Sequence, residues 1–157
     1  MTAAASVRDA QPADIPRLLE LYLQLSEQSE FPEDAPRPAT EEHQAALARI
    51  AADPNARLLV LEVERRVAGT LALYILPNLS HGGRPFALVE NVVVDATLRG
   101  AGYGRLLMER AEALAAAAGC YKVALLSNSK RAPAHAFYER IGFNPTHVGF
   151  TRYADQH

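Results

Sequence analysis

Three glycines alternate in the segment LRGAGYGRLLM at residues 98–108, immediately before a run with the apolar spacing of a helix. Glycine inside a secondary-structure element costs roughly 0.5–1 kcal/mol relative to alanine, so a run of glycines indicates that something must approach the backbone closely. A glycine loop between a strand and a helix directs free backbone N–H groups and the positive end of the helix dipole at an anion, usually a phosphate. The spacing therefore predicts a phosphate-binding loop.

Three known phosphate loops begin in this way, and the residues that follow distinguish them. A Walker A loop ends in Gly-Lys-Ser/Thr, but Gly104 is followed by Arg105 and Leu106. A dinucleotide fingerprint needs a third glycine at position 105 and an acidic residue about 20 residues later, and the sequence has neither. The third pattern, Arg/Gln-x-x-Gly-x-Gly/Ala, is satisfied by residues 99–104. A glycine-rich turn that binds no ligand is the remaining alternative.

A single carboxylate, Glu90, interrupts the apolar strand pattern FALVENVVV at residues 86–94. Burial among apolar side chains raises the pKa of a carboxyl group toward the range in which it can act as a general base. Glu90 is therefore the candidate base of this sequence. The alternatives are that it points outward at an edge of the sheet or that it pairs with a cation of the substrate.

The other nucleophilic and metal-ligating residue types give weaker signals. The one cysteine, Cys120, begins a strand pattern and is expected to be a small buried residue rather than a nucleophile. A single cysteine also excludes an internal disulfide and fits a reducing compartment, so we expect a cytoplasmic protein. The five histidines show no metal-ligand spacing, and no metal site is expected.

Length and charge limit the class of protein. The 157 residues suit one compact domain, and we expect residues 1–157 to form it. The net charge of −2 excludes a general attraction to nucleic acid or to an anionic membrane, so any anion site must be local. No run reaches the ~20 apolar residues of a membrane span, and the first residues lack the apolar core of a secretory signal. We expect neither nucleic acid nor a membrane as a partner.

An α/β fold with a mixed sheet is expected to position these residues. Apolar residues form six strand patterns, at residues 6–10, 57–63, 67–79, 86–94, 121–127 and 147–153. Helical spacing is found in four segments, at residues 12–25, 40–50, 106–119 and 132–142. The predicted order is β-α-α-β-β-β-α-β-α-β, which is an antiparallel meander followed by a strand–helix–strand crossover.

The second half of the chain carries a family resemblance. The run VENVVVD before the glycine loop and the runs GCYKVALLSN and AHAFYERIGF after it have the order and spacing of the GNAT family of N-acetyltransferases, which use acetyl-CoA. Residues 88–143 resemble that family, and VRDAQPADIPRLLEL is similar to its first strand and helix. The resemblance implies the GNAT acyl-CoA N-acyltransferase fold, with a bulged central strand that splays away from its neighbour.

The resemblance also implies where acetyl-CoA binds. The glycine loop would wrap the pyrophosphate, mainly through backbone N–H groups, and the splayed strand would pair with the pantetheine arm. Asn128 matches an asparagine that contacts the pantetheine or the start of a helix, and Arg131 would reach the 3′-phosphate. The residues implied in the strand and the loop are Val92, Val93, Val94, Arg99, Gly100, Ala101, Gly102, Tyr103, Gly104 and Arg105.

The same resemblance implies how the reaction proceeds. Direct attack by an amine in a ternary complex needs a base, because the amine is an ammonium ion at neutral pH. Glu90 matches the glutamate that many family members use as this base, and backbone N–H groups near Asn91 and Val92 would bind the thioester oxygen. Tyr138 matches the tyrosine that the family places beside the sulfur, where it can donate a hydrogen bond or a proton to the forming thiolate. A tyrosine packed in the core is the alternative.

The acceptor is expected to be a primary amine on a small molecule or on a protein. The second half also resembles the glucosamine-phosphate N-acetyltransferase branch, although Asn91 stands where that branch has an aspartate. Family members are often dimers, so a homodimer is expected. A non-catalytic acetyl-CoA-binding sensor and a different nucleotide in the loop are the competing hypotheses. The candidate acceptor-site residues are Tyr22, Phe31, Tyr74, His81, Arg84 and Phe150.

Overall fold

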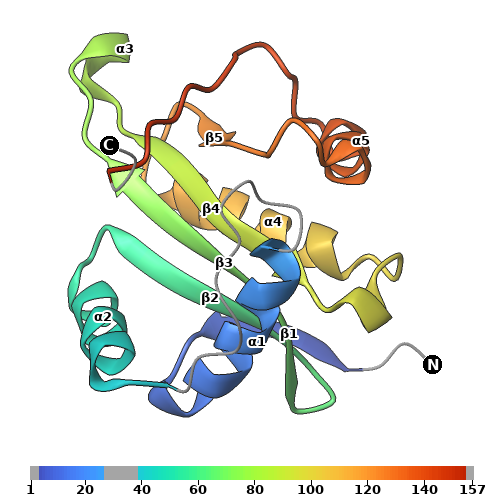
Figure 1. Cartoon of the computed structure of the whole chain (residues 1–157). Helices are drawn as coiled ribbons and strands as arrows, with labels where there is room; N and C mark the ends of the chain where they lie inside the picture. Colours follow the sequence, from blue (N-terminus) through green and yellow to red (C-terminus); the bar gives the residue numbers. More distant parts are fainter. Residues whose placement is uncertain (1–3, 27–38, 155–157) are drawn as a thin grey trace. The chain divides into compact units, whose positions relative to one another are not determined.

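A five-stranded sheet organises the computed structural model, which describes residues 4–26 and 39–154. Residues up to Leu125 form one compact unit, and residues from Leu126 onward form a second. The sheet belongs to the first unit and has the strand order β1-β2-β3-β4-β5, as Figure 1 shows. Because the spatial order follows the sequence, each strand lies beside the one before it.

Four strands form an antiparallel meander, and the fifth is parallel to the fourth. A tight turn joins β2 to β3. Glu64 and Arg65 take left-handed φ values of 48° and 66°, which suit a tight hairpin. The strands are β1 Ala5–Asp9, β2 Ala56–Val63, β3 Arg66–Leu76, β4 Phe86–Val94 and β5 Val123–Leu125.

Helices lie on both faces of the sheet. Figure 1 shows α1 on one face and α4 on the other. The buried residues of α1 are Ile15, Leu18 and Leu21, and in α4 Leu107 and Met108 are fully buried. The helical segments are η1 Pro12–Asp14, α1 Ile15–Ser26, α2 Glu41–Ala52, α3 Ser80–Gly83, η2 Ala96–Leu98, α4 Tyr103–Ala117 and, in the second unit, α5 Ala132–Arg140. In the described ranges, none of these helices has the length and apolar character needed to cross a membrane.

The sheet and α4 approach closely at Gly69 of β3. A Cβ atom at this position would lie 2.8 Å from the Val93 carbonyl oxygen and 3.2 Å from Leu107 Cδ1, too close for a side chain to fit without movement. The side-chain position of Gly69 therefore faces α4. Because side chains alternate along a strand, Thr70 and Ala72 both lie on the opposite face of the sheet from Gly69, which is the face where α1 lies.

The last predicted strand is wrong. Residues 147–153 carry an alternating pattern, but the structure has no strand there. A strand needs a neighbour that pairs with its N–H and C=O groups, and the described part of the second unit contains a helix and no strand. Val148 and Phe150 would share one face and are 80% and 92% exposed, so burial does not stabilise an extended form. The strand predicted at 121–127 is present but shorter, as β5.

A buried carboxylate ties the start of α1 to the sheet. Asp14 is 8% exposed and accepts two hydrogen bonds from the Arg8 guanidinium of β1, at 2.8 and 3.0 Å. It also accepts the Gln11 N–H at 2.7 Å, and Arg8 Nε donates to Glu62 of β2 at 3.0 Å. The hydrogen bonds from Arg8 hold the pKa of Asp14 below its ordinary value, so the ionised carboxylate stabilises the fold.

We expect Asp14→Asn to lower the free energy of unfolding by about 1–2 kcal/mol at neutral pH, because Arg8 then donates to a neutral group. Since folding depresses the pKa of Asp14, this stabilisation is complete above the ordinary carboxyl pKa of 3.8 and is lost as the pH falls through the lower folded value. Urea titrations at a series of pH values measure both effects.

The control is Asp9→Asn, which breaks an exposed ion pair with Arg57 at 2.7 Å. Exposed pairs contribute little, so the loss of unfolding free energy is expected to be clearly smaller than for Asp14→Asn. Equal losses in the two variants would contradict the anchoring role of Asp14.

Candidate functional site

β4 contains a bulge opposite β3. One residue separates Thr70 from Ala72 on β3, whereas two residues separate their partners on β4, Val93 and Glu90. The extra residue makes a β-bulge, and Asn91 within it takes a left-handed φ of 54°, a conformation that asparagine adopts more readily than most side chains. The bulged central strand that the resemblance implies is therefore present, and the bulge begins directly after Glu90.

Near this bulge, the edge of β4 that faces away from β3 has no strand beside it in the described part of the first unit. The parallel pairing with β5 covers only Ala87, Leu88 and Val89. In the described part of the first unit, no strand pairs with this edge over residues 90–94. The predicted cofactor-binding residues 92–94 lie on this stretch. Backbone N–H and C=O groups of this stretch that do not pair with β3 suit an extended ligand that carries amides of its own.

Glu90 lies on the face of the sheet where α1 lies. It pairs with Ala72, on the opposite side of β3 from Gly69 and α4. The carboxyl group is half-buried, and burial raises its pKa above the ordinary value. Across the described ranges, no hydrogen bond or ion pair involves this carboxyl group. A partly desolvated carboxylate without a partner is chemically suited to accept a proton.

The glycine loop and the first turn of α4 present backbone N–H groups without side-chain caps. Gly100 and Gly102 take left-handed φ values of 86° and 85°, and nothing lies within 4 Å of where a Cβ atom would be. α4 begins at Tyr103, and no side chain caps it at Gly102. Gly104 lies in its first turn. The first N–H groups of a helix have no carbonyl partner in the helix, so these amides and the positive helix end suit an anion.

The two arginines of the loop differ in what their side chains contact. Arg99 Nε donates to the carbonyl oxygen of Val94 at 3.3 Å, which places its guanidinium beside the end of β4. Arg105 Nε donates to Glu109, one turn later in α4, at 3.0 Å. The Glu109 carboxylate offsets part of the Arg105 charge that would attract a phosphate. The backbone N–H of Arg105 is therefore the stronger candidate contact at that position.

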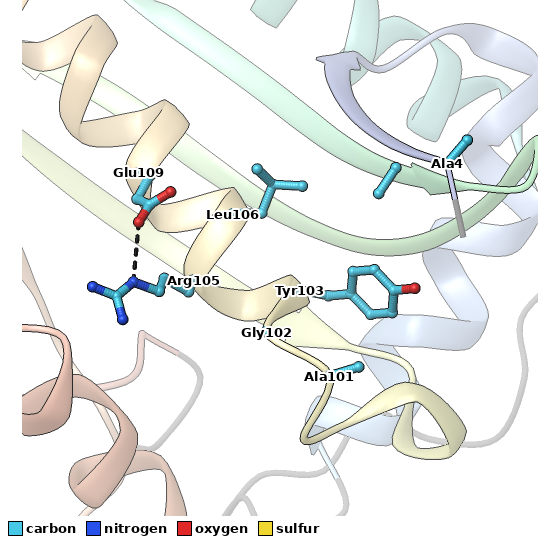
Figure 2. Close-up of a pocket in the computed structure, with 8 residues that line it drawn as sticks. Ala4, Ala101, Gly102, Tyr103, Arg105, Leu106 and Glu109 are labelled. Atoms are coloured by element: carbon cyan, nitrogen blue, oxygen red, sulfur yellow. Dashed lines mark hydrogen bonds and ion pairs between the residues drawn. The ribbon is translucent and has the colours of Figure 1, made fainter. Parts of the chain in front are cut away.

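A hollow of about 540 Å³ opens beside the loop. In Figure 2, the Tyr103 ring points to one side of α4, whereas Arg105 and Glu109 lie toward the other. Four of the predicted cofactor-binding residues line this hollow: Ala101, Gly102, Tyr103 and Arg105. Residues at the start of β1 and in α4 that the sequence did not indicate line it as well. The lining residues are Ala4, Ala5, Ala101, Gly102, Tyr103, Arg105, Leu106 and Glu109.

Tyr138 is the buried residue of α5, in the second unit. Its ring packs against Phe137 and Phe143, with ring centroids 5.2 and 6.1 Å away. Burial raises the pKa of the phenol, so the hydroxyl stays protonated at neutral pH. Within residues 4–26 and 39–154, no hydrogen bond involves this hydroxyl. Core packing therefore accounts for the ring of Tyr138 but not for its hydroxyl.

Asn128 and Arg131 belong to the turn that leads into α5. The Asn128 side-chain oxygen accepts the Lys130 N–H at 2.9 Å, and its carbonyl oxygen accepts the Arg131 N–H at 3.0 Å. His135 Nε2 lies 2.8 Å from the same carbonyl oxygen. The hydroxyl of Ser127 is buried and has no hydrogen-bond partner in the part of the chain that the structure describes. The contacts of Asn128 with Lys130, Arg131 and His135 organise the start of α5.

Two candidate acceptor-site residues have contacts within the first unit. Arg84 donates to the carbonyl oxygens of Gly119 and Cys120, at 3.2 and 3.1 Å, just beyond the end of α4. A cation at this end complements the helix dipole. His81 stacks on Tyr121, with ring centroids 3.9 Å apart. The structure thus gives both side chains a role in holding the segment before β4 against the end of α4.

The other acceptor candidates are spread over the chain. Tyr74 lies two residues after Ala72 on β3 and shares the sheet face of Glu90. Tyr22 lies on α1, and Phe150 is 92% exposed in the second unit. Phe31 lies outside the described residues. Tyr74 is therefore the acceptor-site candidate that lies on the same face of the sheet as Glu90, the candidate base.

Sequence reasoning missed the residues that hold the turn before the glycine loop. Asp95 caps η2, because its Oδ1 accepts the N–H and the hydroxyl of Thr97 at 2.9 and 2.8 Å. Arg17 of α1 binds the other carboxylate oxygen, and Gln24 of α1 accepts the Ala96 N–H at 2.9 Å. The Asp-x-Thr pattern is a local capping signal that the sequence does contain. The contacts from α1 join residues 78 and 72 positions apart and leave no local signal.

Comparisons with known proteins identify the family. The sequence pattern of the Acetyltransferase (GNAT) family matches residues 19–143, which run across both units. A glucosamine 6-phosphate N-acetyltransferase of Trypanosoma brucei brucei is 42% identical over 78 residues, which are 50% of this chain and 51% of that protein. An aminoalkylphosphonate N-acetyltransferase of Salmonella typhimurium is 32% identical over 100 residues, 64% of each. The chain thus spans from about half to less than two thirds of the length of these two relatives.

A solved acetyltransferase structure from Trypanosoma brucei has a similar fold. It matches with a TM-score of 0.76 and 30% identity, covering 96% of this chain and 99% of that one. The predicted α/β class with a mixed sheet is confirmed. Since the family pattern covers most of the sequence and the architecture agrees, this chain belongs to the GNAT family of acetyltransferases.

Proposed function

We propose that this chain is an acetyl-CoA-dependent N-acetyltransferase whose two units act as one domain. The acetyl group would pass directly to a primary amine in a ternary complex. The observation that carries the proposal is the unpaired, half-buried Glu90 carboxylate beside the bulge and the open edge of β4. An acetyl-CoA sensor without turnover has no need of such a group. The family resemblance adds a homodimer to the proposal, and the single cysteine adds a cytoplasmic location.

The first unit offers groups that fit acetyl-CoA, which supplies the acetyl group as a thioester. The uncapped amides at the start of α4 would bind the pyrophosphate, and the open edge of β4 over residues 92–94 would pair with the pantetheine amides. The N–H groups of the bulge at Asn91 and Val92 would hydrogen-bond the thioester oxygen as negative charge develops on it. Main-chain groups thus supply most of the proposed contacts.

Glu90 would take a proton from the ammonium group of the acceptor, directly or through one water molecule. The freed nitrogen lone pair then forms the bond to the acetyl carbon while the carbon–sulfur bond breaks and the sulfur leaves as the thiolate. The nitrogen loses its second proton to solvent as the amide forms. The raised pKa supports this role, because it makes the Glu90 carboxylate a stronger base than an exposed glutamate.

Tyr138 would stabilise the sulfur that leaves with the bonding electron pair. Burial raises the pKa of Tyr138 and keeps its hydroxyl protonated, and the hydroxyl has no acceptor among the described residues. An ordinary phenol has a pKa of about 10 and an ordinary thiol about 8.5, so complete proton transfer to the thiolate is unfavourable. We therefore propose that Tyr138 acts as a hydrogen-bond donor to the sulfur.

The names of the relatives suggest which acceptors to test first. One relative is named for glucosamine 6-phosphate and another for aminoalkylphosphonates. Both names describe a small amine that also carries an anionic phosphorus group. We propose an acceptor of this class ahead of a protein amine, and a screen of amines with thiol release as the readout tests it.

Replacing the proposed base tests the reaction. Glu90→Gln is expected to lower kcat/KM for the acceptor by about 100-fold or more and to leave coenzyme A affinity unchanged, because glutamine cannot accept the proton. In the wild type, kcat/KM should fall as the pH decreases through a pKa above the ordinary glutamate value of 4.5, since only the ionised carboxylate is a base. The variant should lack this decrease.

Thiol release measured with two acceptors of different amine pKa separates the two titrations. A decrease that belongs to Glu90 stays at the same pH with both acceptors, whereas one that belongs to the acceptor moves with its amine. Wild-type activity in Glu90→Gln would exclude Glu90 as the base.

Removing only the hydroxyl tests Tyr138. Tyr138→Phe keeps the packing against Phe137 and Phe143 and is expected to lower kcat by about 10- to 100-fold without lowering the thermal unfolding temperature. Phe143→Leu is the control, because it disturbs the same aromatic packing but leaves the hydroxyl, and it should lower the unfolding temperature more than kcat. A Tyr138→Phe variant with the kcat of the wild type would remove the proposed donor role.

A matched pair of glycines tests the phosphate loop. Gly102 and Gly119 lie at opposite ends of α4, with φ values of 85° and 79° and open space at both Cβ positions. Alanine at either should cost about 1–2 kcal/mol of stability. Only Gly102→Ala is expected to weaken coenzyme A binding, by about 10-fold, because the strain displaces the loop amides. Calorimetric titration of the folded variants with coenzyme A measures the two affinities. Equal coenzyme A affinities in Gly102→Ala and Gly119→Ala would place the loop outside the binding site.

A further inference from the structure

α1 binds two consecutive residues immediately before the glycine loop. Arg17 contacts the carboxylate of Asp95, and the side-chain oxygen of Gln24 accepts the Ala96 N–H at 2.9 Å. Arg17 and Gln24 are seven residues apart in α1, which is about two helical turns, so they extend from the same side of the helix. One helix on the Glu90 face thus holds the backbone that leads into the loop.

The Asp95 contact fixes the first of these two residues firmly. Asp95 is 8% exposed, and its N–H donates to the Ala68 carbonyl oxygen at 2.8 Å. Arg17 also donates to the Val67 carbonyl oxygen at 3.1 Å, which ties α1 to β3 at the same place. Hydrogen bonds from Thr97, together with Arg17, lower the pKa of Asp95 and keep it ionised. Asp95 is therefore a rigid attachment point.

Gln24 binds the residue after Asp95, which is Ala96. Ala96 lies between the anchored Asp95 and the glycine loop. After Ala96 the chain makes the η2 turn, closed by the Leu98 N–H to the Asp95 carbonyl oxygen at 2.9 Å. The loop then passes through Gly100 and Gly102, which have no side chains to hold them. The direction of its amides therefore depends on how the turn enters the loop, and Gln24 restrains that entry.

We propose that Gln24 is a positioning residue for acetyl-CoA, which orients the glycine loop through its hydrogen bond to the Ala96 N–H and does not touch the ligand. The proposal rests on the proposed function, because that function assigns the loop to the pyrophosphate. The hydrogen bond lies at an exposed position, so its loss affects global stability little. A larger effect on ligand affinity than on stability is therefore the signature of positioning.

The test replaces the acceptor oxygen and then restores it. Gln24→Met has a similar shape without the oxygen, and its Kd for coenzyme A is expected to be about fivefold higher, with kcat at saturating acetyl-CoA and the unfolding temperature unchanged. Gln24→Glu keeps an oxygen at the same place and is expected to restore the affinity of the wild type. Gln44→Met is the matched control, because it makes the same change at an exposed position of α2 and should leave Kd unchanged.

The outcomes separate this proposal from the proposed function. Wild-type affinity in Gln24→Met, in a protein that binds coenzyme A normally, would overturn the role of Gln24 and leave the acetyltransferase proposal intact. Equal weakening in Gln24→Met and Gln24→Glu would also overturn it, because the acceptor oxygen would then not be the cause. A wild-type protein that fails to bind coenzyme A would overturn both.

Discussion

One additional residue in β4 is the constraint on which the site depends. β3 and β4 cannot remain in register across the bulge, and the left-handed Asn91 increases the local twist of β4. Pairing with β5 ends at Val89, one residue before Glu90. β5 itself ends at Leu125, the partner of Val89. The bulge and the short β5 together leave Glu90 between a disturbed register on one side and, in the described part of the first unit, an edge without a partner strand on the other.

The proposed recognition of acetyl-CoA relies on backbone groups more than on side-chain charge. The chain has a net charge of −2, and Arg105 near the loop is paired with Glu109. The proposed attraction for phosphates would come instead from amides in the loop and at the start of α4, whose direction is set by left-handed glycines and by the anchored turn at Asp95. Backbone dipoles fixed in this way need little reorganisation when an anion arrives.

The predictable parts of the molecule are those with local causes. The glycine run, the helix after it and the single carboxylate of β4 follow from spacing and residue type, and the structure shows the expected loop, helix and half-buried Glu90. The contacts of Gln24 and Arg84 depend on tertiary placement, so no local pattern indicates them. The predicted strand at 147–153 fails for the opposite reason. Its pattern is local, but a strand also needs a neighbour, and the described part of the second unit offers none.

The Arg84 contacts have a consequence for how α4 is held in place. The carbonyl oxygens just beyond its C-terminal end are already bound by a guanidinium, and the stacked rings of His81 and Tyr121 reinforce the same region. The N-terminal end has no comparable fastening from side chains, because Gly102 offers none. Side chains therefore fasten α4 at its C-terminal end, so the position of the helix on the sheet does not depend on a ligand at its uncapped N-terminal end.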